Sequence, residues 1–363
     1  MTRIPKGLRW SCRSCAKCCI GQQFGPVEQQ TIRGLEQANI ASLWAPAAAG
    51  PWFYERLGPD GRAHAFLAQV DGGRCVFLRD DGLCAVHALL GPQAKPGFCR
   101  EFPYNLMEDP DGLVAVIRPD CGGFFESFAD GEVLTDDDVA HVEALPRVIP
   151  RQRWAPSRVE VLPGHHVEVE TWLAWEPAIQ RCVSAAREPG LLVAELRAEL
   201  ARRCDADLPE PVRQVEVAAS RAMFAALHAV LSRVLSSDGG APHQVAFTRA
   251  RFAQLEAGIQ VVGDSLPLLH PQSEAFVALN LRSFLLSKQF AAWGSVADGV
   301  GCFLLGVRLA QLTAGASTPE AFAAAWTPWH RFTSIGMITQ LLRRAGPALR
   351  DLFLHTGAVD VAQ

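Results

Sequence analysis

The stretch that decides the fold is Cys12-Arg13-Ser14-Cys15-Ala16-Lys17-Cys18-Cys19, which places four thiols within eight residues. Two C-x2-C spacings share Cys15. Such a step lets two thiolates reach one metal while the backbone between them turns its amides toward the sulfurs. Because Cys18 and Cys19 are adjacent, their side chains leave the backbone in different directions. One of them can close the local site while the other faces a second site or a distant ligand.

More cysteines follow this stretch within the first third of the chain, so that eight of the eleven cysteines precede residue 122. The later ones lie beside turns or bends, where the backbone can aim a thiolate, whereas a core cysteine more often lies inside an apolar periodic run. Together with the first stretch, they make a metal centre the favoured interpretation. The predicted ligands are Cys12, Cys15, Cys18, Cys19, Cys75, Cys84, Cys99 and Cys121.

Length and composition limit the class of protein. The chain has 363 residues, 49% of them apolar and 20% charged, which is typical of a globular protein with two domains. A net charge of −4 argues against nucleic acid as the main partner. We see no secretion signal, and the longest apolar stretch is far shorter than the ~20 residues that cross a bilayer. We therefore expect no membrane partner and a cytoplasmic location, where cysteines act as metal ligands before they form disulfides.

The chain divides at a cluster of prolines. Residues 1–145 are rich in Gly and Pro turns, and they are predicted to form a small, loop-rich cysteine-cluster domain with a helix from Pro26 through Ile40 and a strand over 64–70. Residues 146–166 read as a linker. Residues 167–363 are predicted to form an all-α domain, because apolar residues recur at helical spacing around 224–234 and 300–307. The predicted fold class is therefore α+β.

Two kinds of metal centre are compatible with this cysteine pattern. Zinc takes four tetrahedral ligands, often from two C-x2-C arms, and Cys84-Ala85-Val86-His87 also has ligand spacing. By contrast, Cys12-x2-Cys15-x2-Cys18 matches the first three cysteines of the bacterial ferredoxin run, whose fourth ligand comes from afar. The chain lacks the Cys-Pro of that run, so it is not a ferredoxin. The triplet favours an iron–sulfur cluster of the four-iron four-sulfur type, and zinc stays open.

Four segments together resemble the YkgJ-type cysteine-cluster proteins, which are described as a zinc- or iron-chelating domain. These are Cys12 to Cys19, Gly73-Arg74-Cys75-Val76-Phe77-Leu78, Asp81-Gly82-Leu83-Cys84-Ala85-Val86-His87 and Cys99-Arg100-Glu101-Phe102-Pro103. The resemblance covers roughly residues 8–125 and implies metal binding. The chain departs from the family at His87, where an aromatic residue is usual, and at Lys95-Pro96, where Arg-Pro is usual. Arg100 is expected either to neutralise the thiolates or to form a surface ion pair.

The larger layout resembles the flagellin lysine N-methylases, which carry a similar cysteine cluster before a long helical region. This resemblance implies an enzyme that uses S-adenosylmethionine to methylate lysines of a protein partner. The residues themselves show no Gly-rich strand–turn–helix for a nucleotide cofactor. A further alternative is a structural zinc module that presents the helical domain to a partner protein. Cys182, Cys204 and Cys302 lie within helical patterns and are predicted not to be ligands.

Overall fold

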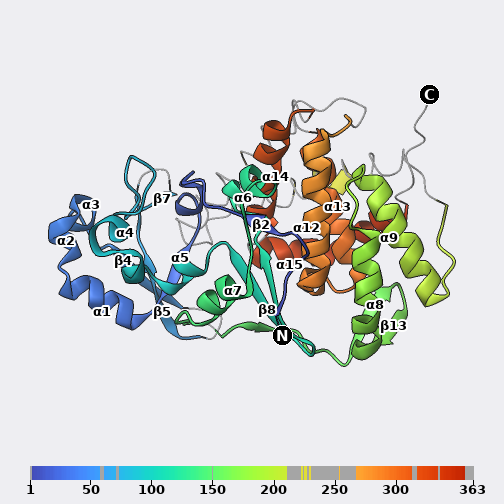
Figure 1. The fold of residues 1–363 in the computed structure, drawn as a ribbon, viewed down its shortest axis with the longest axis horizontal. Helices are drawn as coiled ribbons and strands as arrows, with labels where there is room; N and C mark the ends of the chain where they lie inside the picture. Colours follow the sequence, from blue (N-terminus) through green and yellow to red (C-terminus); the bar gives the residue numbers. More distant parts are fainter. Residues whose placement is uncertain are drawn as a thin grey trace. The chain divides into compact units, whose positions relative to one another are not determined.

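The computed structural model describes residues 2–57, 61–70, 73–148, 150–210, 267–312, 317–333 and 336–355, with a few isolated positions between 222 and 253. It forms two compact units, Met1–Glu108 with Gly112–Arg153, and Asp109–Asp111 with Trp154–Gln363. Small sheets and short helices build the first unit and helices build most of the second (Figure 1). The prediction of an α+β protein is confirmed. Whether residues 1–145 and 167–363 fold as independent domains stays a prediction.

A four-stranded sheet forms one part of the first unit. Its order is β1 (Thr2–Arg3), β9 (Gly112–Ile117), β8 (Tyr104–Asp109) and β11 (Gln152–Arg153). The sequence Asp109-Pro110-Asp111-Gly112 runs from the last residue of β8 to the first residue of β9 and turns the chain directly between them, as such turn residues favour. Residues Val114 to Ile117 of β9 are completely buried, so this strand is the apolar centre of the sheet.

A second sheet carries the segment that precedes the cysteine-rich turns. It has the order β3 (Phe24–Val27), β5 (Ala63–Leu67) and β4 (Phe53–Leu57), with α1 (Gln29–Gln37), α2 (Ile40–Leu43) and α3 (Ala45–Ala48) between β3 and β4. The predicted strand over 64–70 is thus largely present. The prediction of one helix from Pro26 is wrong, because Gly25 and Pro26 belong to β3. A Cβ at Gly25 would lie 2.7 Å from Phe66, so β3 approaches β5 more closely than a larger residue allows.

Short elements surround the cysteines. They are β6 (Gln69–Val70) paired with β7 (Arg74–Cys75), α4 (Ala85–Leu90), η3 (Pro92–Ala94), α5 (Gly97–Glu101), α6 (Gly122–Ser127), β2 (Arg9–Trp10) paired with β10 (Glu132–Val133), and α7 (Asp136–Glu143). Cys75, Val76, Phe77, Ala85 and Val86 are all buried in one apolar cluster with the second sheet. The turns that carry the cysteines are therefore part of the core of this unit.

The second unit opens with a hairpin and continues as helices. The hairpin β12 (Arg158–Leu162) and β13 (His165–Glu168) begins within the last part of the stretch that reads as a linker and extends beyond it. Helices α8 (Val169–Cys182), α9 (Pro189–Cys204), α12 (Pro271–Leu286), η4 (Gln289–Ala292), α13 (Val296–Leu312), α14 (Pro319–Thr333), α15 (Gly336–Arg344) and α16 (Gly346–Leu354) follow. The apolar positions of the predicted helix at 224–234, which are Phe224, Leu227, Leu231 and Val234, lie outside the described residues. No helix in the described ranges is long and apolar enough to cross a membrane.

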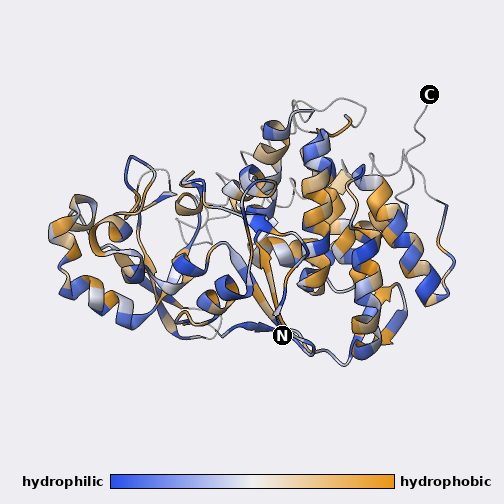
Figure 2. Cartoon of the chain, in the orientation of Figure 1, coloured by the Kyte–Doolittle hydropathy of each residue, from blue (hydrophilic) through white to orange (hydrophobic). Residues whose placement is uncertain are grey.

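Helix α13 is the centre of this unit, since all of its residues are buried. Figure 2 shows apolar residues concentrated along α12 and α13. Glycines let other helices approach α13 closely: a Cβ at Gly301 would overlap the Leu349 carbonyl of α16, and one at Gly306 would overlap Trp329 of α14. A Cβ at Gly299 would likewise overlap Phe290 of η4. Gly299 and Gly301 thus lie inside a helix and serve its packing.

Candidate metal centre

The first cysteine stretch is a tight, irregular loop. Ser14 and Ala16 adopt left-handed conformations, with φ of 49° and 56°, and this turns the chain twice between Cys12 and Cys18. A 3-10 turn, η1 (Lys17–Cys19), follows, with the Cys19 amide donating to the Ala16 carbonyl at 2.8 Å. The Sγ atoms of Cys18 and Cys19 lie 3.7 Å apart. The adjacent thiols therefore converge, contrary to the expectation that they diverge.

Backbone pairing brings Cys19 to Cys75. Ile20 and Arg74 form an antiparallel bridge, and the Gly21 amide donates to the Gly73 carbonyl at 2.7 Å. In antiparallel pairing, the residue before one partner lies opposite the residue after the other. Cys19 therefore lies opposite Cys75. Gly21 and Gly73 have φ of 64° and 72°, a conformation that glycine adopts without strain.

Cys84 is placed by a tight turn after Cys75. Leu78 and Cys84 form an antiparallel bridge, and the Ala85 amide donates to the Phe77 carbonyl at 2.8 Å. Gly82, with φ of 80°, packs closely against the first loop: a Cβ at this position would lie 3.2 Å from the Ser14 carbonyl oxygen. Cys84 then precedes the first residue of α4. The turn thus folds Cys84 back toward Cys75 and the first loop.

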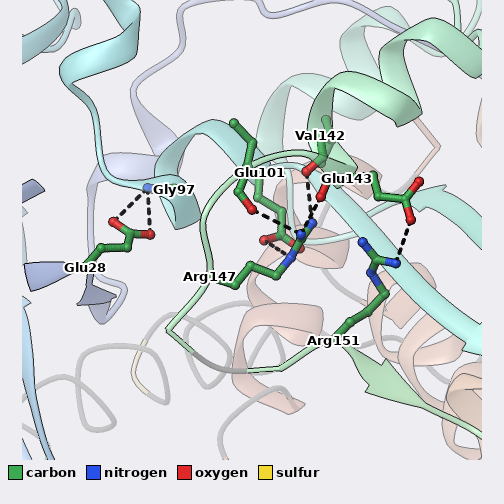
Figure 3. A network of polar contacts seen from close by, with 8 residues as sticks. Glu28, Gly97, Glu101, Val142, Glu143, Arg147 and Arg151 are labelled. Atoms are coloured by element: carbon green, nitrogen blue, oxygen red, sulfur yellow. Dashed lines mark hydrogen bonds and ion pairs between the residues drawn. The ribbon is translucent and has the colours of Figure 1, made fainter. Parts of the chain in front are cut away.

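Cys99 lies on α5, which a polar network holds at both ends (Figure 3). At its start, the Gly97 amide donates to both carboxylate oxygens of Glu28, at 3.1 and 3.2 Å. At its end, Glu101 pairs with Arg147 at 3.3 Å. The Arg147 guanidinium also donates to the carbonyls of Val142 and Glu143, each at 2.9 Å, and so caps the end of α7.

Five thiols from these segments act on one another, and we call them the first thiol group: Cys18, Cys19, Cys75, Cys84 and Cys99. Contact with the Cys18 thiol, and then burial, raises the pKa of Cys19 well above its ordinary value. Burial raises the pKa of Cys75 to about 12, and the charge of Cys84 adds to this effect. Burial likewise raises the pKa of Cys99, with Cys75 contributing. Without a cation beside them, Cys19, Cys75 and Cys99 therefore favour the protonated state.

A lysine that the sequence did not single out as functional faces this group. The positive charge of Lys95 lowers the pKa of both Cys75 and Cys99, against the effect of burial. The guanidinium of Arg100, which was expected to neutralise thiolates or form a surface ion pair, donates to the Gln93 side chain at 2.6 Å. His87 is exposed on α4. The only available signal for Lys95 was its position in place of an Arg before Pro96.

The other predicted ligands are Cys12, Cys15 and Cys121, and Cys121 interacts with Cys15 rather than with the first thiol group. Burial raises the pKa of Cys121 to about 12, and the charge of Cys15 contributes to this increase. The indole N–H of Trp10 and the amide of Gly123 act on the same thiol in the opposite direction. Cys12 is exposed in the same loop as Cys15. We call Cys12, Cys15 and Cys121 the second thiol group.

The donor set fits a thiophilic metal in its chemistry, since thiolates are the ligands that zinc and iron–sulfur clusters prefer. The positions of these thiols, however, do not match a single-ion site. Within the described ranges, no three Cys, His, Asp or Glu side chains converge as the ligands of a single ion do. The late cysteines belong to the second unit: Cys302 is buried in α13, and Cys182 and Cys204 end α8 and α9. That the eight early cysteines are metal ligands stays a prediction.

Comparison with known proteins points to the same segment. Residues 11–122 match the CxxCxxCC family, described as "Putative zinc- or iron-chelating domain". All eight predicted ligands lie within the matched range, so the match supports metal binding by this part of the chain. No curated protein and no solved structure matches the chain. The resemblance to flagellin lysine N-methylases therefore finds no support in these comparisons.

Proposed function

We propose that the chain is a metal-binding protein whose first thiol group holds an iron–sulfur cluster. The observation that carries the proposal is that five thiols from four segments interact, although no three metal-binding side chains in the described ranges converge on one point. A cluster suits this arrangement because each thiolate binds a different iron atom, so the sulfurs surround a volume and need not meet at a point.

A single zinc ion makes a stricter demand on the same thiols. With Zn–S bonds of about 2.3 Å in a tetrahedron, the ligand sulfurs lie about 3.8 Å apart. The sulfurs of Cys18 and Cys19 meet this spacing at 3.7 Å. In the described residues, however, no third donor converges with them, so a four-ligand zinc site is not complete there. Zinc nevertheless uses the same ligand chemistry, and metal analysis distinguishes the two.

The chain's own residues would enclose the cluster and tune it. The Ile20–Arg74 bridge and the α5 network position Cys19, Cys75 and Cys99, and the turn around Gly82 positions Cys84. Lys95 supplies a positive charge beside thiolates that carry negative charge when they bind metal. When bound, an iron–sulfur cluster supplies a site for one-electron transfer.

Anaerobic purification of the full chain, followed by analysis of iron, acid-labile sulfide and zinc, tests the proposal. We expect iron and sulfide in equal amounts, together with broad thiolate-to-iron absorption. Cys75→Ser and Cys99→Ser should remove most of both elements, whereas the control Cys182→Ser, in the helical unit, should retain them. Protein that holds zinc but no sulfide after anaerobic iron and sulfide reconstitution would overturn the iron–sulfur assignment and leave metal binding in place.

A further inference from the structure

The cationic side chains on the segments that carry thiols differ in whether an acidic side chain balances them. Four have a carboxylate partner: Arg13 with Asp130, Lys17 with Glu126, Arg74 with Asp80, and Arg79 with Asp81. Lys95 and Arg100 pair with no carboxylate among the residues that the structure describes. Unbalanced positive charge beside the first thiol group therefore comes from Lys95 and Arg100.

The sequence around these two cations contains no acid that could balance them. Residues 84–100 hold Lys95 and Arg100 but no Asp or Glu, although the whole chain has 38 acidic residues against 34 basic ones. The Arg100 guanidinium donates to the side chain of Gln93 at 2.6 Å, and Gln93 is exposed, so this charge is held at the surface. Lys95 follows η3 directly and is partly exposed. Unbalanced positive charge at a surface favours a negatively charged partner.

Exposed leucines lie in the same short part of the chain. Leu83 immediately precedes Cys84 and is 47% exposed, and Leu89 on α4 is 44% exposed. Helix α4 packs against η3, the element whose Gln93 holds Arg100. Apolar side chains with charged ones around them are typical of protein docking surfaces. We call Leu83, Leu89, Lys95 and Arg100 the basic face.

The first thiol group reaches solvent beside the basic face. Cys84 lies between Leu83 and the first residue of α4 and is partly exposed. Cys99 and Arg100 are neighbours on α5. Electrons pass only over short distances, so a cluster held by these thiols would exchange them through the surface nearest to it. The basic face is such a surface.

We propose that the basic face is the docking surface for an acidic electron-transfer protein, which exchanges single electrons with the cluster of the first thiol group. This inference rests on the proposed iron–sulfur function. In the step, one electron passes from the reduced centre of one protein to the oxidised centre of the other; no covalent bond changes and no proton is transferred. The small size of the face suits such a partner, because electron-transfer complexes bury little surface and charge steers their encounter.

Electron transfer with a partner of each charge provides the test. Full-length protein, loaded with iron and sulfide, is mixed with an acidic plant-type ferredoxin, with either protein reduced, and absorption follows the transfer. Basic cytochrome c is the comparison. We expect the rate with ferredoxin to fall ~10-fold or more as the salt concentration rises from ~0.01 M to ~0.1 M, because salt screens the attraction. The rate with cytochrome c should show no such fall.

Three variants locate the docking surface. Arg100→Gln should slow transfer with ferredoxin ~3–10-fold at low salt, because it removes part of the attraction. Leu89→Glu, which adds a negative charge at an exposed position, should slow it by a similar factor. The control Arg33→Gln removes the same charge from an exposed position on α1 and should leave the rate unchanged. The reduction potential of each variant is measured as well, so that a change in the cluster itself is recognised.

The outcomes separate this proposal from the assignment of the cluster. If the protein takes up no sulfide, the proposed function fails before any partner is added, and the docking proposal falls with it. If the cluster forms but exchanges no electrons with ferredoxin in either direction, or does so at a rate that salt does not change, the basic face is not a docking surface for an acidic partner. Equal slowing by Arg33→Gln and Arg100→Gln, at unchanged potential, would also overturn it.

Discussion

The backbone amide of Gly97 donates to both carboxylate oxygens of Glu28, and this contact ties the Cys99 helix to the residue that precedes α1 (Figure 3). Glu28 also accepts from the Thr31 hydroxyl at 3.0 Å. One carboxylate therefore serves the starts of two helices, where unpaired amides favour negative charge. Since Cys99 is two residues beyond Gly97, any movement of this contact is expected to displace the thiol.

We predict that Glu28→Gln destabilises the first unit and weakens its metal binding. Hydrogen bonds to charged groups contribute about 1.5–3 kcal/mol, and the amide keeps only one acceptor oxygen, so a loss of about 1–2 kcal/mol is expected. Urea unfolding would measure it, and the rate of iron release to a chelator would report on Cys99. The control is Glu36→Gln, an exposed position on α1. Equal behaviour of the two variants would show that Glu28 does not position Cys99.

Gly97 and Gly34 offer a matched pair of glycine substitutions, one on α5 and one on α1. A Cβ at Gly97 would overlap both the Pro146 carbonyl and the Glu28 carboxylate, whereas nothing lies within 4 Å of a Cβ at Gly34. Gly97→Ala should therefore destabilise by about 1–3 kcal/mol through overpacking. Gly34→Ala should stabilise by up to about 1 kcal/mol through helix propensity. Thermal unfolding of both variants measures the difference, and stabilisation by Gly97→Ala would contradict the packing described.

The candidate ligands could be chosen from the sequence, because cysteine spacing is a local property; that they bind metal stays a prediction. The eight ligand candidates, the turn before Cys84 and the helical second half all follow from residues that are close together in the chain. The division of the thiols into two groups could not be predicted. It depends on the Ile20–Arg74 bridge, which joins segments more than fifty residues apart. The interaction of the Trp10 indole with Cys121 is equally non-local, because nothing near Trp10 in the sequence indicates that it lies beside this cysteine.

A buried ion cluster in the second unit was also beyond sequence reasoning. The Lys288 ammonium lies 3.1 Å from the Asp109 carboxylate, pairs with Glu176, and donates to the Leu286 carbonyl at 2.9 Å. The Lys288 side chain is fully buried, and its ammonium lies 5.5 Å from the Trp154 ring centroid. Nothing in the sequence around Lys288 indicates that Asp109 and Glu176, which are far away in the chain, are its partners.

Removal of this cation should be costly. Lys288→Met keeps most of the side-chain length but leaves two buried carboxylates without their shared cation, so we expect a loss of about 3–5 kcal/mol. Arg202→Met, which breaks an exposed pair with Glu199 on α9, should cost less than about 1 kcal/mol. Denaturant unfolding with a probe in the helical unit compares the two. Similar small losses would mean that the carboxylates are protonated or solvated by other means.

The last prediction concerns redundancy among the ligands. The first thiol group has five members, and a four-iron cluster bound by protein alone uses four thiolates, one for each iron. Cys18 and Cys19 lie side by side, with their sulfurs 3.7 Å apart, so either can replace the other with a small movement. Cys75 and Cys99 come from separate segments and have no such neighbour. Single Cys18→Ser and Cys19→Ser variants should therefore retain more than half of the iron and sulfide.

The double variant Cys18→Ser, Cys19→Ser should lose most of the cluster, as should Cys75→Ser alone. Cys204→Ser, at the end of α9 in the second unit, is the control for the loss of a thiol as such. Iron and sulfide analysis after identical anaerobic reconstitution gives the comparison. If either single variant loses as much as the double variant, that cysteine is an obligatory ligand and the redundancy argument is wrong. If the double variant retains its cluster, at least one ligand must come from the second thiol group, and the division of the eight cysteines would have to be redrawn.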